Sequence, residues 1–342
     1  MTEIARRKDE HLDICLESPN TPSHATNGFE RYRFVHNALP EVALKEIDLS
    51  TDFLGRMISA PIIVGAMTGG TDRAGEYNRR LARAAAECNI GMALGSQRAM
   101  LVDRGCAATF AVRKTVVELP LLIGNLGVSE LSRGWSADDY RYLVDHIALD
   151  AIAFHTNPLQ EAIQPKGDTD FRGIVEKLNS IRNIIQRPVI LKEVGSGITR
   201  VVAERLRDRS IDAIEIAGVG GTSWALVEGR RSSDPLKQRL AETFAGWGTP
   251  TAEALVETHT ACPLLPLIAS GGIRTGLDIA KALRLGASAA AVARPLLVSA
   301  DESVEAIIQF IETLIEELRL TCFLVGAKNI KDLKQVPFDT LS

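Results

Sequence analysis

The sequence of 342 residues predicts an α/β protein whose single domain, 1–342, is a (β/α)8 TIM barrel. Eight short apolar runs alternate with amphipathic stretches from residue 61 onward. Each run is almost entirely apolar, which is typical of strands buried on both faces of a parallel sheet. Eight such units suit a closed barrel, while a doubly wound open sheet remains the alternative, because a sequence does not show closure.

The predicted strands are 61–67, 90–95, 121–127, 150–155, 188–195, 213–218, 265–272 and 288–293. Between them, apolar residues recur at helical spacing, which predicts helices over 77–88, 136–147, 171–185, 199–209, 250–261 and 277–287. The stretch 301–334 predicts an eighth helix followed by a short closing helix. Strand and helix therefore alternate almost to the end of the chain.

Two segments fall outside this alternation. Residues 1–55 are rich in turn formers, so we expect an N-terminal extension of loops and a short helix rather than a separate domain. Residues 218–250 are rich in glycine and charge where a short connection would be enough, and long β-α loops are commonly active-site lids. We expect residues 1–30 and 218–250 to order when substrate binds.

Composition limits the class of protein. With 46% hydrophobic residues the chain can bury a large core, and its formal net charge of −4 gives no basic field for non-specific nucleic-acid binding. The charged first residues lack the apolar core of a signal peptide, and no run of about 18 apolar residues indicates a membrane span. The five cysteines are dispersed, without zinc spacing. We expect a soluble cytoplasmic protein with reduced thiols and no nucleic-acid or membrane partner.

Polar residues gather where the predicted strands end, most densely after the fourth strand. There an apolar run stops at His155, Asn157, Gln160 and Glu161, and Pro158 prevents the strand from continuing. The carboxyl ends of parallel strands form the active-site face of a barrel, which favours a catalytic cluster. From this stretch alone, an ordinary turn with solvated side chains is the alternative.

The segment SGGIRTG, 270–276, predicts a phosphate site. Its small residues allow close backbone approach, and the helix that it opens offers free N–H groups. The segment 291–297 follows the eighth strand and would supply the other half of the site, while a pair of tight turns is the alternative.

Two further features indicate anionic ligands. Lys192, at the end of the fifth strand, needs an anionic partner to offset its desolvation, and a reduced flavin ring would be a suitable one. Arg6, Arg7 and Lys8 could bind a diphosphate, although such a charge run is more often a solvated face.

Eight motifs, in order over nearly the whole chain, resemble the type 2 isopentenyl-diphosphate isomerases, which are FMN-dependent barrel enzymes. The motifs are RRKDEH (6–11), MTGG (67–70), GSQRA (95–99), NLG (125–127), HTNPLQE (155–161), KEVGSG (192–197), GGTSW (220–224) and SGGIRTG (270–276). HTNPLQE and RRKDEH are specific to that family rather than to FMN barrels in general.

The resemblance implies interconversion of isopentenyl diphosphate and dimethylallyl diphosphate in isoprenoid biosynthesis, a shift of one double bond without net redox change. It implies reduced FMN as the site of proton addition and removal, Mg²⁺ as the metal ion, and NADPH as the reductant of the flavin. It also suggests a homotetramer or homo-octamer.

The same resemblance assigns site residues. The FMN ring and ribityl chain would contact Ala66, Met67, Thr68, Ser96, Asn125, Lys192 and Thr222, and its phosphate would contact Gly271, Gly272, Arg274, Ala293 and Arg294. The substrate would be surrounded by Arg7, Lys8, His11, Ser96, Arg98, His155, Asn157 and Gln160. Glu161 would bind Mg²⁺, since one carboxylate suffices when water and substrate phosphates supply the other oxygens. His155, Asn157 and Gln160 would form the catalytic group, in which the non-titrating amide of Gln160 would position substrate and relay protons.

Three positions depart from the family's pattern. Thr156 stands where the family usually has leucine, Ala291 where these barrels often have glycine, and Thr199 where serine is common. The methyl group of Ala291 would lie close to the cofactor. None of the three changes removes a charge or ligand that the reaction needs.

Other classes of protein fit the sequence less well. An FMN-dependent barrel oxidoreductase of the 2-hydroxyacid oxidase type needs a histidine at the end of the sixth strand, and 217–224 contains none. A purine-nucleotide dehydrogenase needs a nucleophilic cysteine on a barrel loop, and no cysteine falls at a strand end. A flavin-binding module without catalysis would leave the polar cluster after the fourth strand without a function.

Overall fold

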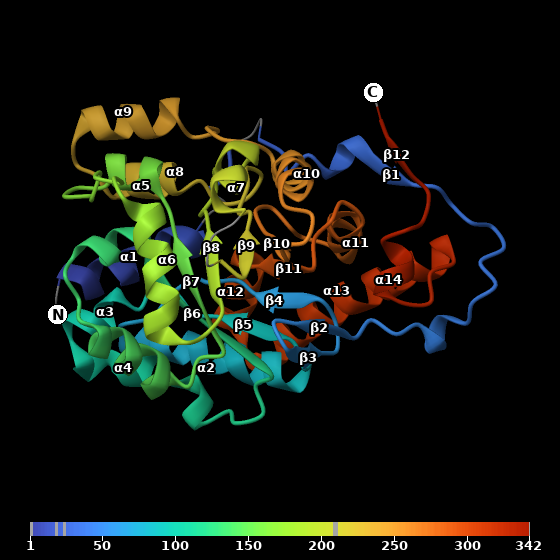
Figure 1. The fold of residues 1–342 in the computed structure, drawn as a ribbon, viewed down its shortest axis with the longest axis horizontal. Coiled ribbons are helices and arrows are strands. Elements are labelled where there is room, and N and C mark those ends of the chain that lie inside the picture. Colours follow the sequence, from blue (N-terminus) through green and yellow to red (C-terminus); the bar gives the residue numbers. More distant parts are fainter. Residues whose placement is uncertain (1–2, 18–19, 23–24, 208–210, 342) are drawn as a thin grey trace.

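The computed structural model describes residues 3–17, 20–22, 25–207 and 211–341. Eight parallel strands close into a barrel in the order β10-β11-β4-β5-β6-β7-β8-β9, with β9 paired to β10 (Figure 1). The prediction of a closed barrel is confirmed, and the open sheet is excluded. The barrel strands are β4 (Ile62–Val64), β5 (Gly91–Ala93), β6 (Leu121–Gly127), β7 (Ala151–His155), β8 (Val189–Lys192), β9 (Ala213–Glu215), β10 (Leu267–Ala269) and β11 (Ala289–Val292).

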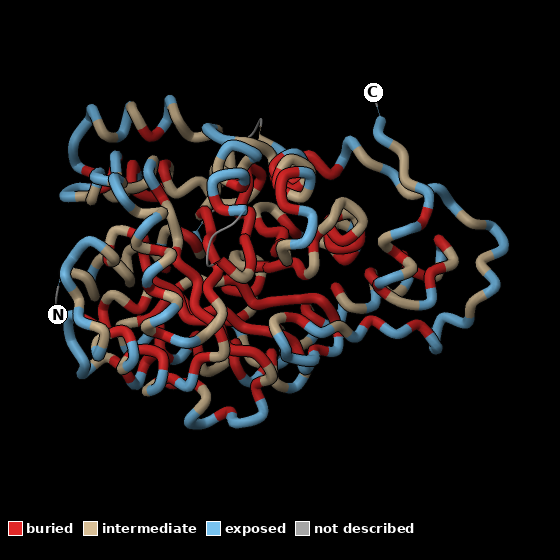
Figure 2. Tube along the Cα trace, in the orientation of Figure 1, coloured by how far each residue is buried: buried red, intermediate tan, exposed pale blue. Residues whose placement is uncertain are grey.

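The barrel interior is filled by alternating isoleucine and alanine side chains. Inward-facing members of this layer include Ile63, Ala93, Ile123, Ala153, Ile190, Ala213, Ile268 and Ala291. Because the strands are buried on both faces, their sequences are nearly continuous apolar runs (Figure 2). The register places His155 opposite Lys192, and Lys192 opposite Glu215, so three polar residues line up across β7, β8 and β9.

The helices predicted between the strands all form, and they surround the barrel (Figure 1). They are α2 (Asp72–Glu87), α4 (Ala137–Ile147), α6 (Ile174–Ile185), α7 (Arg200–Leu206), α10 (Thr251–Ala261) and α11 (Gly276–Arg284). Ser136 and Thr275 start α4 and α11 with capping boxes, in which side chains satisfy the first free N–H groups. At the end of the chain, α12 (Arg294–Glu302) precedes α13 (Val304–Val325) and α14 (Ile330–Leu333), the predicted eighth and closing helices.

The N-terminal extension contains more structure than the expected loops and short helix. A helix of 15 residues, α1 (Glu3–Glu17), packs against α8, α12 and α2. Strand β1 (Tyr32–Phe34) pairs antiparallel with β12 (Phe338–Thr340), which joins the N-terminal extension to the last strand of the chain (Figure 1). The hairpin of β2 (Thr51–Phe53) and β3 (Arg56–Ile58) adds Phe53 and Ile58 to the inner apolar layer.

The segment 218–250 is not the long loop that we expected from its glycine and charge content. It contains two helices, α8 (Trp224–Arg231) and α9 (Pro235–Thr243), which pack on each other. Asp234 caps α9 by accepting a hydrogen bond from the N–H of Leu236, and Pro235 occupies its first turn. The turn formers in this sequence therefore mark helix ends.

The shorter elements lie mainly in the loops. They are the helices α3 (Arg98–Val102) and α5 (Pro158–Ile163) and the 3-10 helices Phe29–Arg31, Leu44–Glu46, Arg104–Thr109, Val112–Lys114 and Val128–Ser132. Among the described residues, no helix combines the length and apolar character that a membrane crossing needs.

Candidate active site

A cavity of about 280 Å³ lies at the carboxyl ends of the barrel strands, with α1 along one side. Each of the eight strand ends contributes to its lining. The lining includes every site residue that we assigned from the sequence, which are Arg7, Lys8, His11, Ala66, Met67, Thr68, Ser96, Arg98, Asn125, His155, Asn157, Gln160, Glu161, Lys192, Thr222, Gly271, Gly272, Arg274, Ala293 and Arg294. The fold therefore gathers these residues in one place, while the ligand that each one binds stays a prediction.

His155 is held as a neutral imidazole. Its Nδ1 lies 2.7 Å from the Oδ1 of Asn125, and an amide oxygen only accepts, so Nδ1 carries the hydrogen and Nε2 keeps a lone pair. Burial, with the nearby charges of Lys192 and Lys8, lowers the pKa of His155 to about 3. At neutral pH this residue is therefore available as a hydrogen-bond acceptor and not as an imidazolium acid.

Lys192 has an anionic partner within the protein. Its Nζ lies 3.3 Å from the Oε1 of Glu215 and donates to the backbone oxygen of Glu193 at 2.8 Å. The hydroxyl of Ser270 donates to the same Glu215 oxygen at 2.9 Å. The predicted anionic partner is present, since the sixth strand supplies Glu215. A flavin ring as a further partner of Lys192 stays a prediction.

Helix α1 brings two of its basic residues to the cavity. The Nη1 of Arg7 donates to the Oε1 of Gln164 at 2.9 Å, and Lys8 lines the cavity beside it. Arg6 behaves differently, since its side chain is 72% exposed and lies 3.6 Å from Glu10. Arg6 therefore lies on a solvated helix face, which was the alternative to diphosphate binding. Arg7 and Lys8 remain candidates for binding a diphosphate.

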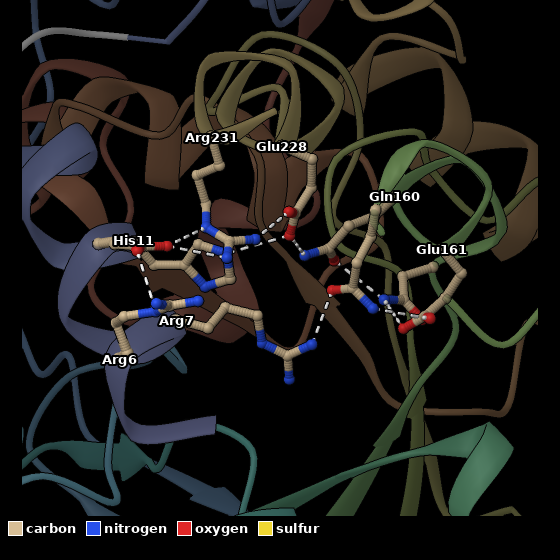
Figure 3. Close-up of polar contacts among 10 residues, drawn as sticks. Arg6, Arg7, His11, Gln160, Glu161, Glu228 and Arg231 are labelled. Carbon is tan, nitrogen blue, oxygen red and sulfur yellow. Dashed lines mark hydrogen bonds and ion pairs between the residues drawn. The ribbon is translucent and has the colours of Figure 1, made fainter. Parts of the chain in front are cut away.

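Glu228 in α8 joins His11 of α1 to Gln160 of α5, as Figure 3 shows. Its carboxylate is fully buried, and Oε1 accepts hydrogen bonds from the Nε2 of His11 at 3.0 Å and the Nε2 of Gln160 at 2.9 Å. Its Oε2 pairs with the Nη1 of Arg231 at 2.5 Å, and Arg231 also binds Glu10 at 2.9 Å. These contacts fix three residues from three different helices.

The charge of Glu228 is stable at neutral pH. Burial alone would raise the pKa of Glu228, but hydrogen bonds from His11 and Gln160 and the charge of Arg231 outweigh it and lower the value to about 2. Burial also lowers the pKa of His11, which then donates as a neutral ring. We did not identify Glu228 from the sequence, because its local context, VEGRR, is typical of a solvated helix face.

Gln160 and Glu161 are oriented by their neighbours. The Nδ2 of Asn157 donates to the Oε1 of Gln160 at 2.9 Å, so the amide of Gln160 is fixed at both ends. The Oε2 of Glu161 accepts from the N–H of Asp168 at 2.7 Å and from the Nε2 of Gln164 at 3.1 Å, and Oε1 accepts from Asn157 alone at 3.1 Å.

The surroundings of Glu161 fit Mg²⁺ as a single carboxylate ligand. Its Oε1 accepts one hydrogen bond and so keeps a lone pair for a cation. Across the described residues, no three His, Cys, Asp or Glu side chains gather in a group that could hold a metal ion. A bound Mg²⁺ would therefore take most of its oxygen ligands from water and phosphate.

The phosphate region is built differently from our prediction. The N–H groups at the start of α11 already have acceptors, because Asp278 accepts from Arg274 and Thr275, and Glu317 accepts from Gly276. These carboxylates would also repel an anion there. Our expectation that this helix offers free N–H groups was therefore wrong.

Two glycine-rich loops at the ends of β9 and β10, residues 218–222 and 270–273, form the corresponding wall of the cavity. They approach so closely that a Cβ on Gly271 would lie 2.1 Å from the oxygen of Gly218, and one on Gly221 would lie 2.8 Å from the nitrogen of Gly272. We call these two loops the glycine cradle. No residue with a side chain fits at either position without moving the backbone.

The cradle fits a flavin phosphate, and the adjoining cavity fits the rest of the molecule. The hydroxyl of Thr68, buried in the cavity lining, has no hydrogen-bond partner within the described chain. It can therefore form a hydrogen bond with a ligand in the cavity. Arg294 lines the cavity and donates from Nε to the backbone oxygen of Cys15 at 2.8 Å. Ala291 lines the same cavity, while the closeness of its methyl group to the cofactor stays a prediction. Thr156 is half-buried.

Lys8 provides a prediction for anion binding as a function of pH. Burial and the charge of Arg7 lower the pKa of Lys8 to about 7, so the neutral amine predominates above that pH. Above pH 7, binding of a diphosphate must then include protonation of Lys8. This protonation costs about 1.4 kcal/mol of binding free energy, a tenfold loss of affinity, for each pH unit above the pKa. We expect the Lys8→Arg variant, which stays charged, to bind inorganic diphosphate progressively better than the unmodified protein as the pH rises from 7 to about 9.

Calorimetric titration at several pH values measures this ratio of affinities. The ionisation of diphosphate itself affects both proteins equally and cancels in the ratio. A ratio that does not change with pH would show that Lys8 is charged throughout.

A (β/α)8 barrel with a cavity and close backbone loops at the carboxyl ends of its strands is the arrangement of barrel enzymes that bind phosphate-bearing ligands. The chain matches the family of FMN-dependent dehydrogenases over residues 2–119 and 147–339. It also resembles the isopentenyl-diphosphate delta-isomerases of Synechococcus sp., at 46% identity over 94% of this chain and 92% of that one, and of Pyrococcus abyssi, at 47% over 97% and 91%. The chain therefore belongs to the FMN-dependent dehydrogenase family and, within it, to the type 2 isopentenyl-diphosphate delta-isomerases.

Solved structures with the same fold are more distant in sequence. Mandelate oxidase bound to (S)-2-phenylpropionate has a TM-score of 0.68 at 20% identity, with 99% of this chain and 98% of that chain covered. Lactate oxidase of Pediococcus acidilactici has a TM-score of 0.70 at 19% identity, with 98% and 94% covered. These similarities establish the barrel fold and carry no information about the substrate.

The structure also bears on the alternatives weighed from the sequence. The sixth barrel strand ends at Glu215 and the chain continues as Ile216 and Ala217, so no histidine stands where a 2-hydroxyacid oxidase needs one. Cys15 of α1 does line the cavity, but burial raises its pKa to about 11. It is therefore a protonated thiol, unsuited to act as the nucleophile of a purine-nucleotide dehydrogenase.

Proposed function

We propose that this protein interconverts isopentenyl diphosphate and dimethylallyl diphosphate with FMN bound in the barrel mouth. The observation that carries the proposal is the hydrogen-bonded group of His11, Gln160 and the buried Glu228, in which His11 and Gln160 line the same cavity as the cationic residues of α1. A reaction that only moves one proton onto a double bond and another off needs such a fixed polar group beside a site for the diphosphate.

The cationic side of the cavity would hold the diphosphate. Arg7 and Lys8 from α1 and Arg98 from α3 line it together, and the Nε of Arg98 lies 3.3 Å from the buried carboxylate of Glu130. Glu161, with its remaining lone pair, would hold Mg²⁺ against the diphosphate. These residues would leave the hydrocarbon end of the substrate facing the strand ends.

The polar group would control the protons at that hydrocarbon end. Gln160 is held by Asn157 and Glu228 and does not titrate, so it positions the alkene and relays protons through its amide. Glu228 stays ionised and would stabilise positive charge that develops nearby. Reduced FMN, when bound, supplies an electron-rich surface and a site of proton exchange.

The remaining partners are part of the same proposal. NADPH would reduce the flavin, and Mg²⁺ would bind only together with the diphosphate. A homotetrameric or homo-octameric assembly and a cytoplasmic location stay predictions from the resemblance. The membership of the chain in the isomerase family supports all four.

Conversion of isopentenyl diphosphate by the purified protein tests the proposal. The assay contains FMN, Mg²⁺ and NADPH under anaerobic conditions, and the Gln160→Ala variant serves as comparison. We expect turnover that requires reduced flavin and falls at least about a hundredfold in the variant, because the variant keeps the cationic residues for the diphosphate and loses the positioned amide. Absence of turnover with flavin still bound would reject the proposal in favour of an oxidoreductase.

A further inference from the structure

The N-terminal segment binds the glycine cradle through two side-chain donors, Thr21, which lines the cavity, and Asn27, which does not. The Nδ2 of Asn27 donates to the backbone oxygen of Gly272 at 2.7 Å, and the hydroxyl of Thr21 donates to the backbone oxygen of Gly221 at 2.9 Å. Arg274 supplies two more donors, from Nη1 to Gly272 and from Nη2 to Gly220, both at 2.9 Å. These donors fix the carbonyl groups of Gly220, Gly221 and Gly272, and the carbonyl group of Gly272 is turned toward Asn27, outside the cavity lining.

The orientation of these carbonyl groups determines where the N–H groups lie. In a trans peptide the C=O and N–H bonds point in opposite directions, and the described chain contains no cis peptide bond. The N–H groups of Gly221, Thr222 and Ile273 are therefore turned away from the donors that bind the preceding carbonyl groups, and all three residues line the cavity. No acceptor in the described part of the chain bonds to these three N–H groups.

Asn27 is itself held firmly in place. Its Oδ1 accepts from the N–H of Phe29 at 3.1 Å, and its backbone oxygen accepts from the N–H of Ala252 at 2.9 Å. Phe29 is buried in the main apolar core, and its own backbone oxygen accepts from Lys281. Asn27 does not line the cavity and so acts on it only through Gly272.

We propose that Asn27, assisted by Thr21, is a positioning residue for the cofactor phosphate, because it holds the Gly272 peptide so that the N–H groups of the cradle face the cavity. The inference rests on the proposed binding of FMN. It assigns the N-terminal segment a second task, since α1 of the same segment lines the substrate side. Loss of the Asn27 amide would let the peptide rotate and would weaken the binding of a phosphate while leaving the flavin ring site unchanged.

Comparison of FMN with riboflavin, which lacks the phosphate, tests the inference. Dissociation constants are measured for the flavin-free protein by quenching of flavin fluorescence. The variants are Asn27→Ala, Asn27→Asp, which keeps an acceptor for the N–H of Phe29, and Thr21→Val, which removes only a hydroxyl. Asn37→Ala is the matched control, because the Oδ1 of Asn37 accepts from the N–H of Leu39 at 3.1 Å in the same kind of turn, remote from the cradle.

We expect the dissociation constant for FMN to rise about tenfold in both Asn27 variants and by a smaller factor in Thr21→Val, as for loss of one hydrogen bond. The dissociation constant for riboflavin should stay within about twofold in all of them, and Asn37→Ala should match the unmodified protein. Equal weakening for FMN and riboflavin, or no weakening for FMN, would overturn the inference. If the unmodified protein binds neither flavin, the proposed function fails together with the inference. If it binds FMN and the variants do not weaken this binding selectively, only the inference fails.

Discussion

The Glu228→Gln variant is expected to lose about a hundred- to a thousandfold in kcat while it still binds FMN. The Oε1 of Glu228 accepts from both His11 and Gln160, and its Oε2 pairs with Arg231. An amide has a single oxygen, so its NH₂ group must face either Arg231 or the other two donors. The variant therefore misplaces Gln160 or leaves Arg231 without its buried partner.

Steady-state kinetics and thermal unfolding together measure this effect. Removal of one member of a buried ion pair costs about 3–5 kcal/mol, and the remaining contact of Arg231 with Glu10 places this variant at the lower end. Glu10→Gln is the matched control, because Glu10 binds the same arginine from a position 41% exposed and outside the cavity lining. A Glu228→Gln variant with normal kcat, or an equally large loss in Glu10→Gln, would contradict the assignment.

The Glu161→Gln variant is expected to lose at least about a hundredfold in activity at any Mg²⁺ concentration. In the variant, the amide oxygen takes the place of Oε2 and still accepts from the N–H of Asp168. The NH₂ group then takes the place of Oε1, the atom that carried the free lone pair. A hydrogen-bond donor then faces the cation. The metal ion is lost rather than bound more weakly, and added Mg²⁺ does not restore the rate.

Initial rates over a range of Mg²⁺ concentrations check this result. Asp168→Asn is the matched control, since that carboxylate lies 3.6 Å from Arg133 and outside the cavity lining, so its loss changes the local charge but no cavity group. The control should keep the normal response to Mg²⁺. Recovery of the Glu161→Gln variant at high Mg²⁺ would show that another residue binds the ion.

Local patterns in the sequence were enough to predict the framework of the fold. Strands buried on both faces of a parallel sheet must be apolar along their whole length, so all eight were recognisable. A strand such as β7, which ends at His155 and is followed by Asn157, also indicates a site, because desolvation makes such polar residues costly elsewhere. Motif resemblance then assigned residues that the fold brings into one cavity.

The partners of those residues could not be predicted in this way. Glu228 lies 68 positions from Gln160 and 217 from His11, and nothing in its neighbouring sequence distinguishes it from a solvated glutamate. The start of α11 looked like a phosphate site, yet Asp278 and Glu317 occupy its N–H groups. Glu317 belongs to another helix, so sequence near residues 270–276 does not reveal it.

By itself, the sequence determined the barrel, the face of the barrel that carries the site, and the family. These depend on short-range periodicity and on motifs in which every residue is visible. Only the tertiary structure decided that Glu215 neutralises Lys192, that Glu228 joins α1 to Gln160, and that Asn27 holds the glycine cradle. The reason is physical, since a buried charge or carbonyl group must find a partner in space, and the chain can supply that partner from any distance along its length.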